Sequence, residues 1–129
     1  MLATTFARAQ FTKAYLQAND LTWKLYSNDI TPNLTHTAAD FTEVTSTGGY
    51  RSHTAHKENW TFTEGTTSTA EYPKESFIFT GASGNIYGWY LVDADGNLIF
   101  AHRFAQTYNI VNADDTIKAG MKINLVQTA

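Results

Sequence analysis

Cysteine is absent from this 129-residue chain, and proline occurs only twice. Without cysteine the chain has neither disulfides nor thiolate ligands, so packing or association between copies must stabilise the fold. No apolar run approaches the roughly 20 residues that span a bilayer, which argues against a membrane-spanning helix. Residues 1–8 lack a basic start and an uninterrupted apolar core, so no secretory signal is expected.

Charge is also scarce, because only 16% of the residues are Asp, Glu, Lys or Arg. An average soluble domain has about 25%. The net charge is −3 and the isoelectric point is about 5.7. This balance offers no electrostatic attraction for nucleic acid or for an anionic membrane, so neither is expected as a partner.

Metal-ligand patterns are weak. His53 and His56 have helical metal-ligand spacing, but in a strand they face opposite sides, and no cysteine or acidic cluster completes a site. Residues 93–97, Asp-Ala-Asp-Gly-Asn, resemble a calcium loop superficially. The glycine comes two positions too early, and Phe104 stands where a bidentate glutamate is needed. We therefore predict a hairpin turn at 93–97 and no metal.

Motifs for catalysis are missing as well. The chain has no Gly-x-Ser-x-Gly elbow. The glycines at 81 and 84 lie between two predicted strands and lack the lysine and helix of a phosphate loop. A paired-carboxylate site stays open as an alternative, although the acidic residues lie mostly in turns. We predict no enzyme and no cofactor.

Three strand-like runs follow one another in the middle of the chain, with turn residues between them. Phe77 and Phe79 share one face of the first run. Both faces of the second run carry large apolar side chains, so we predict a central strand covered on both sides. Together the runs predict an antiparallel meander. The runs are 76–79, 86–92 and 98–104, and the turns between them are 81–85 and 93–97.

Threonine is abundant throughout, and its β-branched side chain suits the solvent side of strands. About eight short strands are predicted at a spacing of roughly 8 to 12 residues, which is typical of an all-β sandwich or barrel. Trp23 is predicted to point inward, and Pro73 belongs at the start or edge of a strand. The remaining predicted strands are 21–26, 41–45, 60–63, 108–111, 116–118 and 121–126, with a turn at 119–120.

Residues 2–18 form the one predicted helix. Thr4 or Thr5 supplies its cap, Asn19-Asp20 ends it, and one face carries Phe11, Ala14, Tyr15 and Ala18. Two interpretations stay open: the helix packs against its own domain, or it is an arm that docks on a neighbouring subunit. The predicted organisation is an N-terminal helical arm at 1–20 and a β-sandwich domain at 21–129.

Six segments carry a family resemblance: LYSNDITP (25–32), FTEVTSTGGY (41–50), WTF (60–62), FIFTGASGNIYGWY (77–90), ADGNLIFAHRF (94–104) and NADDTI (112–117). In order and spacing, between residues 21 and 126, they resemble small virion proteins of tailed bacteriophages. Members of this family serve as head-decoration, structural or tail proteins. The helix at 2–18 falls outside the resemblance.

The resemblance implies a jelly-roll-like antiparallel β-sandwich that works as a capsid decoration, or cement, protein. Such a protein is a homotrimer on the outer face of an icosahedral head, where major capsid subunits meet. The implied partners are further copies of the chain and the major capsid protein. The implied location is the outer surface of the virion's capsid, after assembly in the host cytoplasm.

Candidates for contact with the capsid or with a neighbouring subunit follow from predicted exposure; they are Phe6, Phe11 and Tyr15 on the helix and Asn28, Asp29 and Asn33 in the loop after the first strand. The turn at 93–97 is expected to project elsewhere. An alternative function is a tail or fibre-tip module that binds a host-surface glycan or another tail protein through exposed Trp, Tyr and Asn side chains. A small glycan hydrolase is a third possibility, which requires two acids, or an acid and a histidine, in a cleft.

Overall fold

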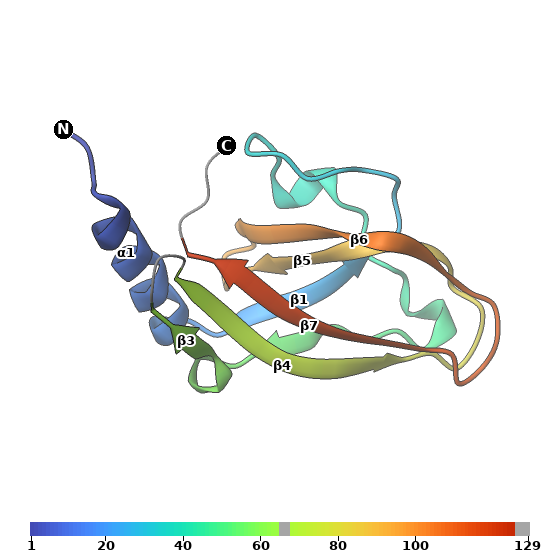
Figure 1. The fold of residues 1–129 in the computed structure, drawn as a ribbon. Helices are drawn as coiled ribbons and strands as arrows, with labels where there is room; N and C mark the ends of the chain where they lie inside the picture. Colours follow the sequence, from blue (N-terminus) through green and yellow to red (C-terminus); the bar gives the residue numbers. More distant parts are fainter. Residues whose placement is uncertain (65–67, 126–129) are drawn as a thin grey trace.

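A computed structural model describes residues 1–64 and 68–125 (Figure 1). In chain order the elements are α1 (Thr5–Ala18), β1 (Leu21–Tyr26), η1 (Ala38–Asp40), η2 (Ser46–Gly48), β2 (His53–Ala55), η3 (Lys57–Asn59), β3 (Thr61–Thr63), β4 (Thr69–Ile78), β5 (Gly84–Val92), β6 (Leu98–Ile110) and β7 (Thr116–Asn124). The three η elements are short 3-10 helices.

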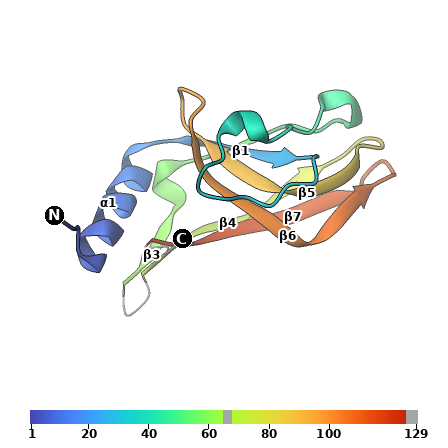
Figure 2. The same cartoon turned by 90° about the horizontal axis from the view of Figure 1, so that it is seen from above.

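The strands form two antiparallel sheets. Sheet A has the order β2-β1-β5-β6, and sheet B has the order β3-β4-β7. The sheets pack face to face, and α1 lies at one end of them (Figures 1 and 2). The predicted all-β sandwich with one N-terminal helix is therefore confirmed, with seven strands in the described part of the chain.

Trp23 of β1 lies fully buried between the two sheets, as predicted. Its ring meets the rings of Tyr72, Phe77 and Trp89 edge to face, at centroid distances of 5.9, 5.3 and 6.2 Å. Such ring pairs contribute about 0.5–1.5 kcal/mol each beyond the burial of their area. Because Tyr72 and Phe77 belong to β4, this cluster joins sheet B to sheet A.

The central strand β5 is buried on both faces, which confirms the prediction for 86–92. Trp89 and Leu91 face sheet B in the main core. Tyr90 and Val92 belong to a second cluster with Phe41, which comes from the segment between β1 and β2. That segment therefore covers the outer face of sheet A.

The predicted meander is wrong at its first connection, because β4 belongs to sheet B and β5 to sheet A. The chain crosses between the sheets at 79–83. Phe79 is fully buried at this crossing, and its backbone bonds to Asp114 and Asp115 beyond β6. Turn residues indicate that the chain reverses, but they do not indicate in which sheet it continues. The hairpin at 93–97 is confirmed, with Gly96 at φ 84°.

The predicted strands at 98–104 and 108–111 are one long strand, β6. Its register against β5 passes from Gly88 opposite Arg103 to Ile86 opposite Tyr108. Four residues of β6 therefore lie opposite a single residue of β5, so β6 forms a bulge at 104–107. The polar residues of this bulge produced the apparent break in the strand pattern.

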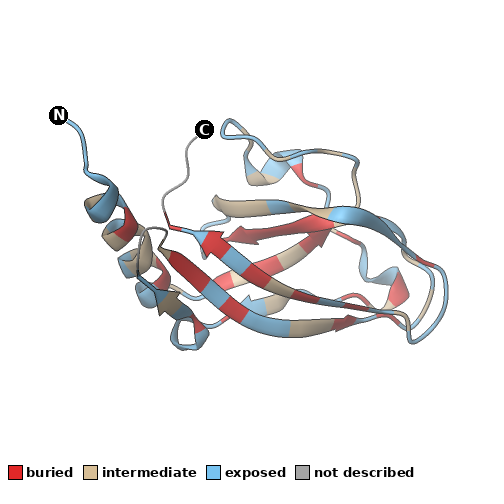
Figure 3. Cartoon of the chain, in the orientation of Figure 1, coloured by how far each residue is buried: buried red, intermediate tan, exposed pale blue. Residues whose placement is uncertain are grey.

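The predicted turn at 119–120 is also wrong, because Gly120 lies inside β7. A Cβ atom at Gly120 would lie 3.1 Å from the Lys74 side chain and 3.3 Å from the carbonyl oxygen of Tyr72. The glycine thus permits close approach of β4 rather than a turn. Figure 3 shows the alternation of buried and exposed residues along β7. Val126, in the last predicted strand, lies outside the described residues.

Pro73 lies inside β4, at a shift of register between Tyr72 and Glu75. The other neighbour, β3, pairs only with Thr69–Glu71 of this strand. Beyond that point one side of β4 has no neighbouring strand among the described residues. Proline has no backbone N–H, and at this position β4 is paired on one side only. The expected position of Pro73 at an edge is therefore confirmed.

Two short strands differ from the prediction. Residues 41–45 form no strand and contribute only an isolated bridge between Glu43 and Tyr26. By contrast, β2 forms where no strand was predicted, and Leu21 of β1 pairs there with Ala55. A three-residue His-Thr-Ala strand has too little apolar alternation to be recognised from sequence.

Helix α1 begins and ends as predicted, within a few residues. The Thr4 hydroxyl accepts a hydrogen bond from the backbone N–H of Ala7 at 3.1 Å. At the other end the Asn19 side chain donates to the carbonyl oxygen of Tyr15 at 2.9 Å. These bonds satisfy backbone groups that have no partner inside the helix.

The face of α1 that packs inward differs from the prediction. Ala9 and Leu16 are buried in the same core as Trp23, whereas Phe11 is exposed. Ala14 and Ala18 are exposed as well. The described chain thus has α1 packed against its own sandwich. Ala9 and Leu16 are two helical turns apart and share a stripe, but a small alanine is a weak signal beside the bulky Phe11.

Candidate functional site

Helix α1 and the residues just before it carry large apolar side chains that are mostly exposed. The exposed fractions of Phe6 and Phe11 are 71% and 66%, and Met1 and Leu2 just before the helix are almost fully exposed. Tyr15, the third predicted contact residue of the helix, is half-buried against the main core. Burial and the nearby carboxylates of Asp93 and Asp95 raise its pKa.

Polar contacts hold another side of α1 to the end of β3. Gln10 donates to a Glu64 oxygen at 3.2 Å, and Lys13 reaches the same oxygen at 3.4 Å. These contacts lower the pKa of Glu64. The Lys13 ammonium also lies 5.5 Å from the centre of the Phe62 ring. These contacts hold α1 to β3, while Phe6 and Phe11 stay exposed.

Two of the loop candidates, Asn28 and Asn33, make hydrogen bonds within their own loop. The Asn28 side chain donates to the carbonyl oxygen of Asp40 at 2.9 Å and accepts from the backbone N–H of Thr42 at 2.8 Å. The side-chain oxygen of Asn33 accepts hydrogen bonds from the backbone N–H and from the hydroxyl of Thr35, at 2.9 and 2.7 Å. Both asparagines therefore shape the loop.

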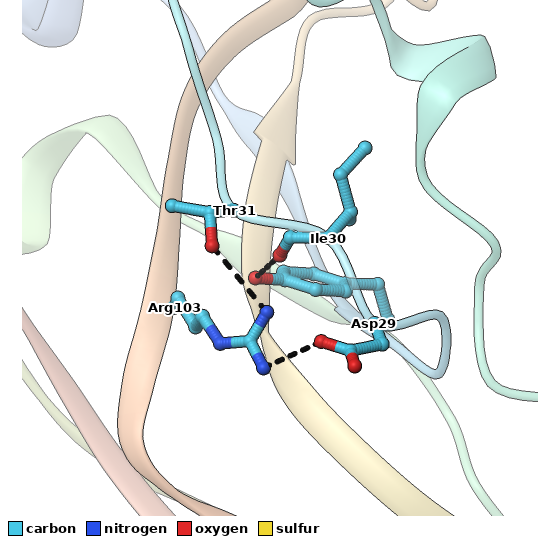
Figure 4. Close-up of polar contacts among 5 residues, drawn as sticks. Asp29, Ile30, Thr31 and Arg103 are labelled. Atoms are coloured by element: carbon cyan, nitrogen blue, oxygen red, sulfur yellow. Dashed lines mark hydrogen bonds and ion pairs between the residues drawn. The ribbon is translucent and has the colours of Figure 1, made fainter.

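Asp29, the third loop candidate, forms an ion pair with Arg103 of β6 (Figure 4). Arg103 Nη1 also lies 3.4 Å from the Thr31 hydroxyl, and its guanidinium is 5.3 Å from the centre of the Tyr87 ring. Beneath them Tyr26 donates to the carbonyl oxygen of Ile30 at 3.1 Å. The sequence did not point to Arg103, because a single arginine in a predicted strand indicates only a solvated position.

The six predicted contact residues do not form one continuous surface. Asn28 and Asp29 follow the end of β1 that points away from α1 (Figure 1). Phe6 and Phe11 lie at the opposite end. Of the six, the two phenylalanines are large, apolar and exposed. They remain the candidates that a protein contact would bury.

Strand β6 carries a row of rings at the edge of sheet A that sequence reasoning missed. His102 lies 5.6 Å from the buried ring of Trp89, and Phe104 lies 5.1 Å from Tyr108 between ring centres. Partial burial lowers the pKa of His102. Ile78 and Val111 are exposed apolar residues near the end of the sandwich opposite α1.

A pocket of about 380 Å³ lies between the loop that contains η1 and the β5–β6 turn. Its lining residues are His36, Thr37, Ala38, Ala39, Gly96, Asn97 and Leu98. The two walls are distant in sequence, so no local motif predicted this pocket. Its lining combines polar and apolar groups.

His53 and His56, whose spacing resembles that of metal ligands, contact separate partners. His53 of β2 has Nε2 3.0 Å from the carbonyl oxygen of Ser76, and its ring centre is 4.4 Å from that of Phe77. The backbone N–H of His56 donates to the Tyr72 hydroxyl at 3.0 Å. Within residues 1–64 and 68–125, no group of three or more His, Asp or Glu side chains is placed to hold a metal ion.

Asp93 holds the hairpin turn that was predicted at 93–97. Its carboxylate accepts from the backbone N–H of Asn97 at 2.8 Å, from the Asn97 side chain at 3.1 Å and from the backbone N–H of Asp95 at 2.9 Å. These bonds lower the pKa of Asp93. The carboxylate is engaged in shaping the turn.

Comparisons with protein-family models, with curated proteins and with solved structures give no match to this chain. No helix of the described residues is long and apolar enough to cross a membrane.

Proposed function

We propose that the chain is a capsid decoration protein of a tailed bacteriophage, which binds the outside of the head as a homotrimer and stabilises the shell. The resemblance of its six sequence segments to small virion proteins supports the viral part of this proposal. The exposed phenylalanines of α1 support a role that depends on protein contact.

The exposed phenylalanines of α1 are the observation that carries the proposal. Full burial of a phenylalanine side chain stabilises a fold or a complex by about 1.5–3 kcal/mol. Phe6 and Phe11 gain little of this free energy in the single chain, because both are mostly exposed. Leu2, which precedes the helix, is a further large apolar side chain that is almost fully exposed. Clusters of exposed apolar side chains on a soluble domain mark interaction sites. The partner would be a neighbouring copy or the major capsid protein.

The sandwich suits a permanent structural contact. Its aromatic core joins the two sheets, and α1 is anchored through Leu16, so the phenylalanines stand on a well-packed support. Threonine-rich surfaces lose little side-chain entropy when they are immobilised. Such a contact needs no cofactor and no chemical step.

The proposed mechanism is mass action on the shell. A protein that binds only the assembled lattice stabilises that lattice by its free energy of binding, and many copies add their contributions. In a trimer, each weak contact is reinforced by the two others. The stabilised shell would resist the pressure of packaged DNA.

The copy number on purified particles tests this function. Quantitative mass spectrometry of particles stripped of their tails gives the ratio of this chain to the major capsid protein. A ratio near one to one, or of one trimer per local threefold position, is expected. A few copies that disappear with the tails would overturn the decoration role and favour a tail module.

A pair of variants tests the contact surface. Phe6→Ser combined with Phe11→Ser should abolish binding to heads that lack this protein, and the heads should then disrupt at lower temperature. Ile78→Ser is the matched control, because Ile78 is 58% exposed on β4, near the end opposite α1. Equal binding by both variants would exclude α1 as the contact, whatever the copy number.

A further inference from the structure

We propose that the pocket between the η1 loop and the β5–β6 turn binds a neutral sugar. This inference goes beyond the decoration role and does not depend on it. A volume of 380 Å³ is at the lower end of the roughly 300–1,000 Å³ typical of small-molecule sites. The size therefore suits one sugar residue of a surface glycan rather than a long segment of it.

Hydrogen bonds hold both walls of the pocket in place. In the first wall, an Asp40 carboxylate oxygen accepts from the backbone N–H of Thr37 at 2.7 Å, and Asn28 donates to the carbonyl oxygen of Asp40. In the second wall, Asp93 binds Asn97 through both backbone and side chain. Because these walls are already ordered, a ligand loses less free energy in ordering them.

The lining offers a sugar the two kinds of contact that it needs. Thr37 and Asn97 carry polar side chains suited to hydroxyl groups, whereas both ring nitrogens of His36 face Asn33, at 3.2 and 3.1 Å. Leu98 and the two alanines of η1 provide an apolar surface for the C–H groups of the ring. This combination of an apolar floor with a few polar groups is the usual composition of a small-ligand site.

Charge selects a neutral ligand. None of the seven lining residues is Asp, Glu, Lys or Arg. The carboxylates of Asp40 and Asp93 stand within the two walls and repel an anion. A phosphorylated or acidic sugar is therefore disfavoured.

An NMR titration of the isolated protein tests the proposal. Glucose, galactose, mannose and N-acetylglucosamine are added separately up to about 50 mM, a range that reveals dissociation constants in the millimolar range. At least one sugar should cause saturable shifts of the backbone amides of 36–39 and 96–98. The absence of saturable shifts with all four would overturn the proposal.

Two variants and a charged probe sharpen the test. Ala39→Trp fills the pocket and should remove the shifts, whereas Ala82→Trp, an exposed control near the other end of β5, should leave them unchanged. Shifts that persist in Ala39→Trp would exclude this pocket. The 6-phosphate of the sugar that binds should bind about two- to fivefold more weakly, as one exposed charge interaction predicts. Equal binding would contradict the argument from charge.

Discussion

Arg103 Nη2 and Asp29 Oδ1 lie 2.6 Å apart, although the two residues are separated by 74 positions in the sequence. The pair joins the loop after β1 to the edge strand β6 (Figure 4). The exposed fractions of the two side chains are 32% and 70%. Because water screens such a pair, it orients the loop more than it stabilises the fold.

Asp29→Asn should therefore lower the free energy of unfolding by only about 0.2–1 kcal/mol. The loss of stability caused by Asp29→Asn should be smaller in high salt, because dissolved ions screen the attraction between the two charges. Urea denaturation measures it, and a double-mutant cycle with Arg103→Gln isolates the pair. A coupling above about 2 kcal/mol would contradict a solvent-screened contact.

Gly88 of β5 occupies a position where no side chain fits. A Cβ atom there would collide with the carbonyl oxygen of His102 and would lie 2.6 Å from the Tyr26 hydroxyl. Gly88→Ala should lower the free energy of unfolding by about 3 kcal/mol or more. This is the upper end of the usual cost of overpacking, because here the backbone must move. Gly81→Ala is the control, since nothing lies within 4 Å of its Cβ position. Thermal denaturation compares the two, and equal losses would contradict the close approach.

Local patterns predicted much of the fold. The alternation in Leu21–Tyr26 identified β1 with its observed bounds, and the apolar residues on both faces of 86–92 identified a central strand. The Asp-Gly turn at 93–97 identified a hairpin. Each of these features depends on neighbours within a few residues, which is why sequence alone was sufficient.

Features that depend on distant segments were not predictable in this way. The sheet that a strand joins after a turn is decided by packing, so the crossing between β4 and β5 was missed. The pair of Asp29 and Arg103 and the pocket between η1 and Gly96 arise for the same reason. Exposure of Phe6 was expected and is observed, but its role as a contact stays a prediction.

Leu16 should be the anchor of α1, because it is fully buried in the main core. Leu16→Ala should lower the free energy of unfolding by about 2–5 kcal/mol, through lost burial and the cavity left behind. Phe11→Ala, although it removes a larger side chain, should change it by less than about 0.5 kcal/mol in the isolated chain. Chemical denaturation of both variants checks the order. A larger effect at Phe11 would restore the helical face predicted from sequence.

Stability should fall in alkaline solution because of two buried tyrosines. Burial raises the pKa of Tyr26 and of Tyr90 to about 12 each. Tyrosine in an unfolded chain ionises near pH 10. Between about pH 10 and pH 12 the unfolded state thus holds fewer protons than the folded state, so the free energy of unfolding decreases as the pH rises and is fully retained below pH 10. Tyr90→Phe removes one of the two groups, and its melting temperature should fall less steeply across this window. Parallel curves for the variant and the unmodified chain would show that Tyr90 ionises as readily in the fold as outside it.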